Sequence, residues 1–117
     1  MKKKIRKFET GATRDSAKNK PEYVGFLSPL VLKSFGKYMT KHRKQSDGEL
    51  RASNNWKKGI PVEEYIQSLM RHFIDLWLHF DGFPKEARES EEDAWNGVLF
   101  NIQGYAYERL KKNDKYT

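Results

Sequence analysis

Acidic, amide and imidazole side chains fall at matching places in the last two helical segments expected along the chain. A short loop over residues 82–89 would join these segments as an antiparallel hairpin, so that residues whose numbers add up to about 171 lie opposite each other. Asp75 then faces Asn96, and His79 faces Glu92. Oxygen ligands from facing helices suit a hard divalent cation such as Mg²⁺. The spacing therefore indicates a metal site.

Each of these groups also has a purely structural interpretation. The acids at 91–93 follow Ser90, and acids are common in the first turn of a helix because they oppose its dipole. Asp75 would be solvated or paired with Arg71. His72, beside Tyr65 and Leu76 on the helical wheel, would be an ordinary histidine at the edge of the core. The residues alone leave both interpretations open.

A second candidate is the loop Asn54-Asn55-Trp56-Lys57-Lys58-Gly59. It offers a ring for stacking on a base, two cations for phosphate and a glycine that allows close approach of the backbone. Stacking of a base on an aromatic ring contributes about 1–3 kcal/mol. The alternative is that Trp56 only fixes the loop to the core. Arg14, Lys18 and Lys20 would extend the phosphate-binding surface if the N-terminal arm folded over it.

Several classes of chemistry are excluded by what the sequence lacks. It has no cysteine, which rules out a thiolate zinc site, a cysteine nucleophile and a disulfide scaffold, and which suits a reducing cytoplasm. It has no Walker-type glycine loop, no His-Glu-x-x-His and no Gly-x-Ser-x-Gly. If the protein is a hydrolase, the attacking group is expected to be water activated by a metal.

Three helices are expected to position these residues. Ser28-Pro29 begins the first, which runs to about residue 44. Pro61 begins the second, which ends at Asp81-Gly82, and Ser90 caps the third, which ends near residue 110. The second and third helices carry apolar stripes, namely Val62, Ile66, Leu69, Met70, Phe73, Trp77 and Phe80, and Trp95, Val98, Leu99, Ile102, Ala106 and Leu110.

Two glycines lie opposite the stripe of the third helix. Gly97 and Gly104 are seven residues apart, so they share a face that permits close approach of another backbone or a ligand. The predicted fold is all-α: a bundle of three main helices at 23–112, an irregular basic arm at 1–22 and a frayed tail at 113–117. Three helices cannot cover both faces of each other, so completion by a homo-oligomer is expected.

Composition and charge narrow the partners. The chain has 117 residues, 37% of them hydrophobic and 33% charged, which allows one domain with an arm. No apolar run is long enough to span a membrane, and no apolar stretch follows the basic start as in a secretory signal. Residues 1–20 hold eight lysines and arginines against two acids, whereas residues 59–117 hold seven against eleven. A basic front facing acidic helices favours phosphates beside a metal over a nucleic-acid partner.

The sequence resembles the phage-type dATP/dGTP diphosphohydrolase N-terminal family, relatives of the MazG-like all-α nucleoside triphosphate pyrophosphatases. The stretches that carry the resemblance span about residues 8 to 110. They are Glu9-Thr-Gly-Ala-Thr-Arg-Asp15 with Lys20-Pro21, Leu27-Ser-Pro29, Asn55-Trp-Lys-Lys-Gly-Ile-Pro61, Ser68-Leu-Met-Arg-His72 with Asp75, and Ala94-Trp-Asn96.

The resemblance implies a cytoplasmic enzyme, acting in an infected host cell if phage-encoded. It would bind a purine deoxynucleoside triphosphate with Mg²⁺ or Mn²⁺ and release pyrophosphate. Asp75 and Glu92, with Asn96, would hold the metal, and His72 would bind phosphate or orient water. The lysines and Arg71 would neutralise the triphosphate. The expected substrate-binding residues are Arg14, Asp15, Lys18, Lys20, Asn55, Trp56, Lys57, Lys58, Arg71 and Asn96.

The sequence also departs from the MazG-like pattern. Where that pattern has Glu-Glu-x-x-Glu, residues 63–67 end in Gln67, and its Glu-x-x-Asp is matched only by Glu89-Ser-Glu-Glu92. The loss of carboxylates weakens metal binding. The alternative function is therefore a protein that binds and sequesters a nucleotide or a cyclic-nucleotide signal without cleaving it. A nucleic-acid-binding accessory role rests on charge alone, and the acidic back half argues against it.

Overall fold

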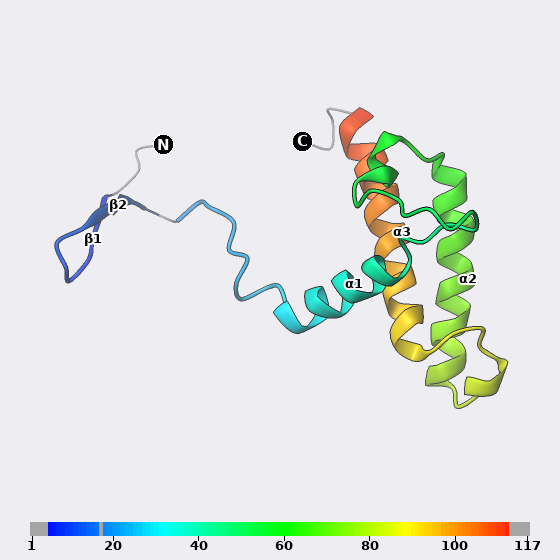
Figure 1. Ribbon diagram of the computed structural model, residues 1–117. Coiled ribbons are helices and arrows are strands. Elements are labelled where there is room, and N and C mark those ends of the chain that lie inside the picture. The colour runs from blue at the N-terminus through cyan, green and yellow to red at the C-terminus, as the bar shows by residue number, and fades with distance from the viewer. Residues whose placement is uncertain (1–4, 17, 113–117) are drawn as a thin grey trace.

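The computed structural model describes residues 5–16 and 18–112 and is mostly helical (Figure 1). Three α-helices dominate: α1 (Pro29–Lys41), α2 (Val62–Phe80) and α3 (Glu91–Lys112). The predicted all-α class and three-helix arrangement are confirmed. The oligomer stays a prediction, and the tail expected at 113–117 lies outside the described residues. Among the residues described, no helix combines the length and the apolar character needed to cross a lipid bilayer.

The helix ends follow the predicted local chemistry. The Ser28 hydroxyl accepts a hydrogen bond from the Val31 amide at 3.2 Å, and Pro29 occupies the first turn of α1. The Ser90 hydroxyl accepts one from the Asp93 amide at 3.1 Å and so caps α3. After α2, Gly82 adopts a φ of +87°, a conformation that favours glycine, and the chain turns toward α3.

Helices α2 and α3 form an antiparallel hairpin, joined by a loop that contains the short 3₁₀ helix η2 (Pro84–Glu86), and α1 packs against α3 (Figure 1). The seam between α2 and α3 is narrow because α3 presents glycines there. A Cβ placed on Gly97 would lie 2.4 Å from the His72 ring, and one on Gly104 would lie 2.2 Å from the Tyr65 ring. The glycine face was expected to admit another backbone or a ligand, whereas in the structure the His72 and Tyr65 side chains of α2 occupy it.

The seam is built from polar and small residues rather than from the apolar stripes. Its buried members include Tyr65, Asp75, Ala94, Asn96, Gly97, Asn101, Gly104 and Glu108. The stripe of α2 instead lies largely on the surface. Five residues of this stripe are exposed, and we call them the outer face of α2: Ile66, Met70, Phe73, Trp77 and Phe80. The hairpin closes through the glycine face of α3, where the rings of His72 and Tyr65 from α2 lie directly against the α3 backbone.

The N-terminal arm differs from the irregular segment that was expected. Strands β1 (Ile5–Lys7) and β2 (Thr13–Asp15) pair antiparallel, and the Phe8 amide donates to the Ala12 carbonyl across the turn at 2.9 Å. The prediction missed these strands because each has only three residues and their side chains are exposed, so neither shows an alternating pattern.

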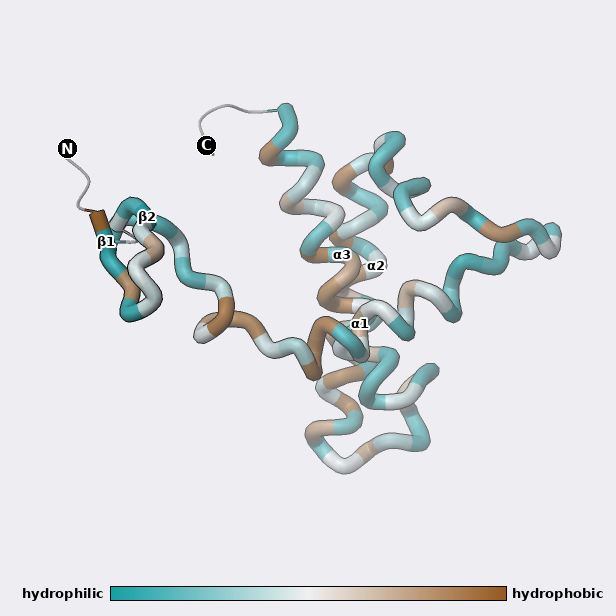
Figure 2. Tube along the Cα trace, turned by 60° about the vertical axis from the view of Figure 1, so that its left-hand side comes forward, coloured by the Kyte–Doolittle hydropathy of each residue, from teal (hydrophilic) through white to brown (hydrophobic). Residues whose placement is uncertain are grey.

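The arm projects away from the helices and gives the molecule its extents of 58 × 34 × 29 Å (Figure 1). Its last part is hydrophobic, as the brown stretch leading into α1 in Figure 2 shows. We call residues 23–30 the arm segment. Its large apolar side chains, all exposed, are Tyr23, Val24, Phe26, Leu27 and Leu30.

Candidate functional site

A cavity of about 470 Å³ lies between α1, the segment at 42–60 and the α2–α3 hairpin. This volume is within the range of small-molecule sites, about 300–1,000 Å³. Aromatic, basic and amide side chains line it, among them Tyr38, His42, Arg43, Arg51, Asn55, Trp56, His72, Phe100, Asn101 and Gln103. Of the predicted residues, the cavity gathers Asn55, Trp56 and His72.

Trp56 belongs to the short 3₁₀ helix η1 (Asn55–Lys58) and combines the two roles considered for it. Its ring packs edge-on against Tyr107, with centroids 4.9 Å apart, and against Phe100 at 6.2 Å, so it does fix the loop to α3. It also lines the cavity. The Lys57 ammonium lies 5.6 Å from the centroid of the Trp56 ring. An aromatic wall is thus paired with a cation on the same short element.

Two arginines outside the predicted set of site residues, Arg43 and Arg51, hold together the two ends of the loop at 44–50, beside the cavity. We call this pair the neck. The Arg43 Nε donates to the Arg51 carbonyl at 2.8 Å, and the Arg51 guanidinium donates to the His42 carbonyl at 2.5 Å. An isolated β-bridge between Lys44 and Leu50 lies just beyond them. Both arginines line the cavity, so they bring positive charge to it. Their position depends on the folded loop, which has no periodic pattern in the sequence.

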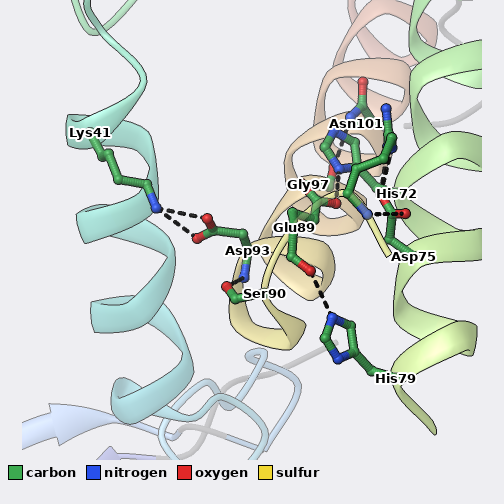
Figure 3. Close-up of polar contacts among 10 residues, drawn as sticks. Lys41, His72, Asp75, His79, Glu89, Ser90, Asp93, Gly97 and Asn101 are labelled. Carbon is green, nitrogen blue, oxygen red and sulfur yellow. Dashed lines mark hydrogen bonds and ion pairs between the residues drawn. The ribbon is translucent and has the colours of Figure 1, made fainter. Parts of the chain in front are cut away.

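A group of titratable side chains adjoins the cavity through His72. The ligand atoms of His72, Asp75 and Glu89 all lie within 4.8 Å of one another. The His72 Nδ1 is 2.5 Å from the Glu89 carboxylate. The first two residues lie one turn apart on α2, and Glu89 comes from the loop before α3 (Figure 3). Because Nδ1 is bonded to Glu89, Nε2 is the imidazole nitrogen left for a ligand.

Asp75 is 3% exposed and is held by Arg88. The Arg88 Nε donates to Oδ2 at 2.8 Å, a second guanidinium nitrogen lies 2.6 Å from the same oxygen, and the Arg88 amide donates to Oδ1 at 3.1 Å. Burial alone would raise the pKa of the Asp75 carboxyl, but the bonds and charge of Arg88 outweigh burial and hold that pKa below its ordinary value. Asp75 is therefore paired with Arg88, and neither solvated nor paired with Arg71.

Neighbouring groups position this cluster. The His79 Nε2 donates to the Glu89 carbonyl at 2.7 Å and thereby fixes the backbone that carries the carboxylate (Figure 3). Tyr38 of α1 lines the cavity near the same acids. Burial, reinforced by the charges of Glu89 and Asp93, raises the pKa of Tyr38 to about 12. The phenol thus keeps its proton over an even wider pH range than an ordinary tyrosine and can act as a hydrogen-bond donor.

The donor set of His72, Asp75 and Glu89 fits a divalent cation in its chemistry. Two carboxylates and an imidazole converge, and a cation would balance the second carboxylate, since one arginine already balances the first. Mg²⁺ prefers oxygen ligands alone, whereas Mn²⁺ also accepts imidazole. The set therefore suits Mn²⁺ better than Mg²⁺.

The two other predicted metal ligands lie against α1. Glu92 is exposed and accepts a hydrogen bond from the Ser34 hydroxyl at 2.8 Å. Asn96 is fully buried and donates from Nδ2 to the same hydroxyl at 2.9 Å. The structure thus brings Asp75 together with Glu89 and His72 instead. The signal for Glu89 was present in the sequence as the first acid of Glu89-Ser-Glu-Glu92, whereas Arg88 carried no signal.

The predicted phosphate-binding residues are spread over the molecule. Arg14 and Asp15 lie in β2, and Lys18 and Lys20 lie in the exposed chain that follows. None of these four is among the residues that line the cavity. Lys57 and Lys58 are exposed on η1, near the cavity wall. Arg71 is exposed on α2, although it directly precedes His72.

Comparison with known proteins gives no match: no family model, no curated protein and no solved structure is significantly similar to this chain.

Proposed function

We propose that the protein binds a purine nucleoside triphosphate in the cavity and, with a divalent cation, hydrolyses it to the monophosphate and pyrophosphate. The observation that carries this proposal is that one residue, His72, both lines the aromatic, basic cavity and belongs to the cluster with Asp75 and Glu89. A base-sized apolar space and a donor set for a cation are therefore contiguous. The resemblance described above supports the same activity.

The side chains divide naturally between the parts of such a substrate. Trp56 supplies a face of the cavity on which a base can stack. Arg43 and Arg51 supply positive charge for phosphate oxygens. His72, whose Nδ1 is held by Glu89, presents Nε2 to orient a water molecule or to bind a phosphate oxygen.

A bound cation would neutralise charge on the phosphates and lower the pKa of a water molecule. The water oxygen would form a bond to the α-phosphorus as the bond to the bridging oxygen breaks, and pyrophosphate would leave with the electron pair. The proton lost by the water would pass to a base or to bulk solvent. Glu89 and Asp75 would hold the cation, and His79 would keep Glu89 in place.

The test is release of pyrophosphate from dATP or dGTP with Mn²⁺ or Mg²⁺. Glu89→Gln and Asp75→Asn are each expected to reduce the rate by at least about 100-fold, because each removes a metal ligand and loss of a partner that only supports a ligand already costs about 10–100-fold. Glu91→Gln is the matched control, because Glu91 is an exposed acid of the same region and lies outside the cluster. Glu92→Gln should leave the rate unchanged if the observed cluster holds the cation, and should reduce it if the ligand set expected from the sequence does.

One observation favours the second candidate, a nucleotide-binding protein that does not cleave. Arg88 already satisfies both oxygens of Asp75, so this carboxylate must give up part of that pairing to hold a cation. If calorimetry shows that dATP binds and chromatography recovers it intact after long incubation with metal, the binding function replaces the enzymatic one. If neither dATP nor dGTP binds, both proposals are wrong.

We also propose that the protein acts as a homo-oligomer with a nucleotide, and not a nucleic acid or a membrane, as its partner. The exposed outer face of α2 supports the oligomer. The acids of the α2–α3 region support the choice of nucleotide over duplex, because they would repel a long polyanion.

A further inference from the structure

Among the exposed apolar surfaces in the described part of the chain, the two with the most exposed side chains are the arm segment and the outer face of α2, which belong to different elements. The arm segment, residues 23–30, exposes Phe26 to 84% and Val24 to 92%. The outer face of α2 exposes Trp77 to 56% and Phe80 to 84%. Monomeric proteins rarely expose continuous apolar patches of more than a few hundred Å².

We propose that the arm segment of one copy docks on the outer face of α2 of a second copy, and that the second arm returns the contact. Each chain carries one arm segment and one outer face of α2, so in a dimer every arm segment has one face to bind. Reciprocal exchange covers both surfaces on both copies, whereas pairing of the two α2 faces alone would leave the arm segments in water. The inference does not depend on what the cavity binds.

The area involved is that of a stable interface. Five large apolar side chains on the arm segment and five on the outer face of α2 are each between about two fifths and nine tenths exposed. At roughly 200 Å² for each large side chain, and with only the exposed fraction of each counted, the ten side chains offer on the order of 1,000 Å² per copy. A standard specific interface buries about 800 Å² per partner.

Charge favours the same pairing. Residues 1–20 carry eight basic side chains against two acidic ones, and residues 59–117 carry seven against eleven. Within the second region, Glu63 is exposed on α2 and lies about 60° from the centre of the outer face on the helical wheel. An arm that docks by its apolar segment therefore brings its basic part toward the half of the partner that carries net negative charge, which favours encounter of the two copies.

The arm is placed to leave its own molecule. Ser28 is extended and Pro29 begins α1, so the chain enters this helix from the side away from the hairpin (Figures 1 and 2). Hydrogen bonds of the arm run within it, such as Leu27 amide to Tyr23 carbonyl at 2.9 Å and Gly25 amide to the Glu22 carboxylate at 2.6 Å. This geometry presents the apolar side chains outward as a preformed unit.

The first experiment measures mass in solution by light scattering. We expect a dimer of twice 13.9 kDa at about 100 µM, with dissociation on dilution. Phe26→Asp and Trp77→Asp are each expected to weaken the dimer at least about 100-fold while the helical circular dichroism is kept, because both side chains are exposed within one chain. A wild-type monomer at that concentration overturns the proposal, and so does a dimer unaffected by Phe26→Asp.

The second experiment identifies which surfaces meet. The sequence contains no cysteine, so an introduced cysteine has no native thiol to compete with it. A tagged Val24→Cys chain mixed with an untagged Met70→Cys chain should form a mixed disulfide under mild oxidation. In the control, a tagged Asp47→Cys chain, whose cysteine lies at an exposed loop position, replaces the Val24→Cys chain and should not form the disulfide with Met70→Cys. A disulfide that forms only within a doubly substituted single chain would show that the arm folds back, and would overturn exchange.

Discussion

Substituting Gly97 by alanine tests the central feature of the hairpin, the contact of the His72 ring with the α3 backbone. Within a helix, alanine is ordinarily better than glycine by about 1 kcal/mol. At this position the new Cβ would lie 2.4 Å from both Cγ and Nδ1 of His72, where ordinary contact begins near 3.4 Å. The ring must move, and movement breaks its 2.5 Å bond to Glu89.

The magnitude follows from these opposing effects. Forcing an extra methyl group into a packed seam costs typically about 1–3 kcal/mol. Loss of a hydrogen bond to a charged group adds about 1.5–3 kcal/mol if the ring leaves Glu89 entirely. Because the ring must leave Glu89, and after the helix gain of about 1 kcal/mol, we expect Gly97→Ala to lower the free energy of unfolding by about 1.5–5 kcal/mol. Gly36→Ala in α1 is the matched control, because a Cβ there meets nothing within 4 Å, and it should stabilise by about 0.5–1 kcal/mol.

Urea unfolding followed by circular dichroism measures both variants, at one fixed protein concentration. The decisive step is to repeat Gly97→Ala in a His72→Ala background, where the overlap is gone and the substitution should stabilise as Gly36→Ala does. Two results would refute the reasoning. One is a Gly97→Ala protein as stable as the Gly36→Ala control, and the other is an equal loss with and without the His72 ring.

Three further outcomes are expected from the seam. Gly104→Ala should destabilise by about 1–3 kcal/mol in urea unfolding, since the Cβ would lie 2.2 Å from the ring of Tyr65, which is 2% exposed, so the packed seam must shift to admit it. Arg88→Ala should destabilise by about 1–3 kcal/mol at neutral pH, because the buried Asp75 carboxylate keeps its burial cost and loses its partner, and a gain in stability would contradict the pairing. The folded-state pKa of Asp75 is depressed, so its contribution to stability is present above the unfolded-state pKa and is lost as pH falls through the folded-state pKa. Unfolding measured from pH 6 to pH 2 should show that loss. In Arg88→Ala, burial raises the Asp75 pKa instead, so the contribution of Asp75 should change sign and the variant should regain part of its lost stability as the carboxyl is protonated at low pH.

The helices could be predicted from the sequence because their signals are local. Ser28-Pro29, Pro61 and Ser90 mark starts through the geometry of single residues, and periodic apolar positions mark lengths. The facing of α2 and α3 was also within reach, since two glycines at a spacing of seven identify the face that comes closest. The antiparallel hairpin then follows from a short loop.

The composition of the site could be predicted only in part. His72 and Asp75 lie on a regular helix, so their level along the bundle follows from counting residues. Glu89 and Arg88 lie in the loop before α3, where no repeat fixes direction, and the contacts of that loop decide which acid turns inward. Counting favoured Glu92 for this reason, yet Glu92 is turned toward Ser34 of α1.

The neck formed by Arg43 and Arg51 has a consequence for how anything enters the cavity. Residues 44–50 form a loop whose two ends are held together by the guanidinium-to-carbonyl hydrogen bonds of Arg43 and Arg51 and by one β-bridge between Lys44 and Leu50. If these few hydrogen bonds break, the loop can move away from the cavity as a unit while α1, α2 and α3 stay folded. Such local opening has a lower free energy than global unfolding. We expect amide hydrogen exchange in this loop to be faster than in α2 and α3. A ligand bound in the cavity should slow it, so the exchange rate would report ligand entry and exit.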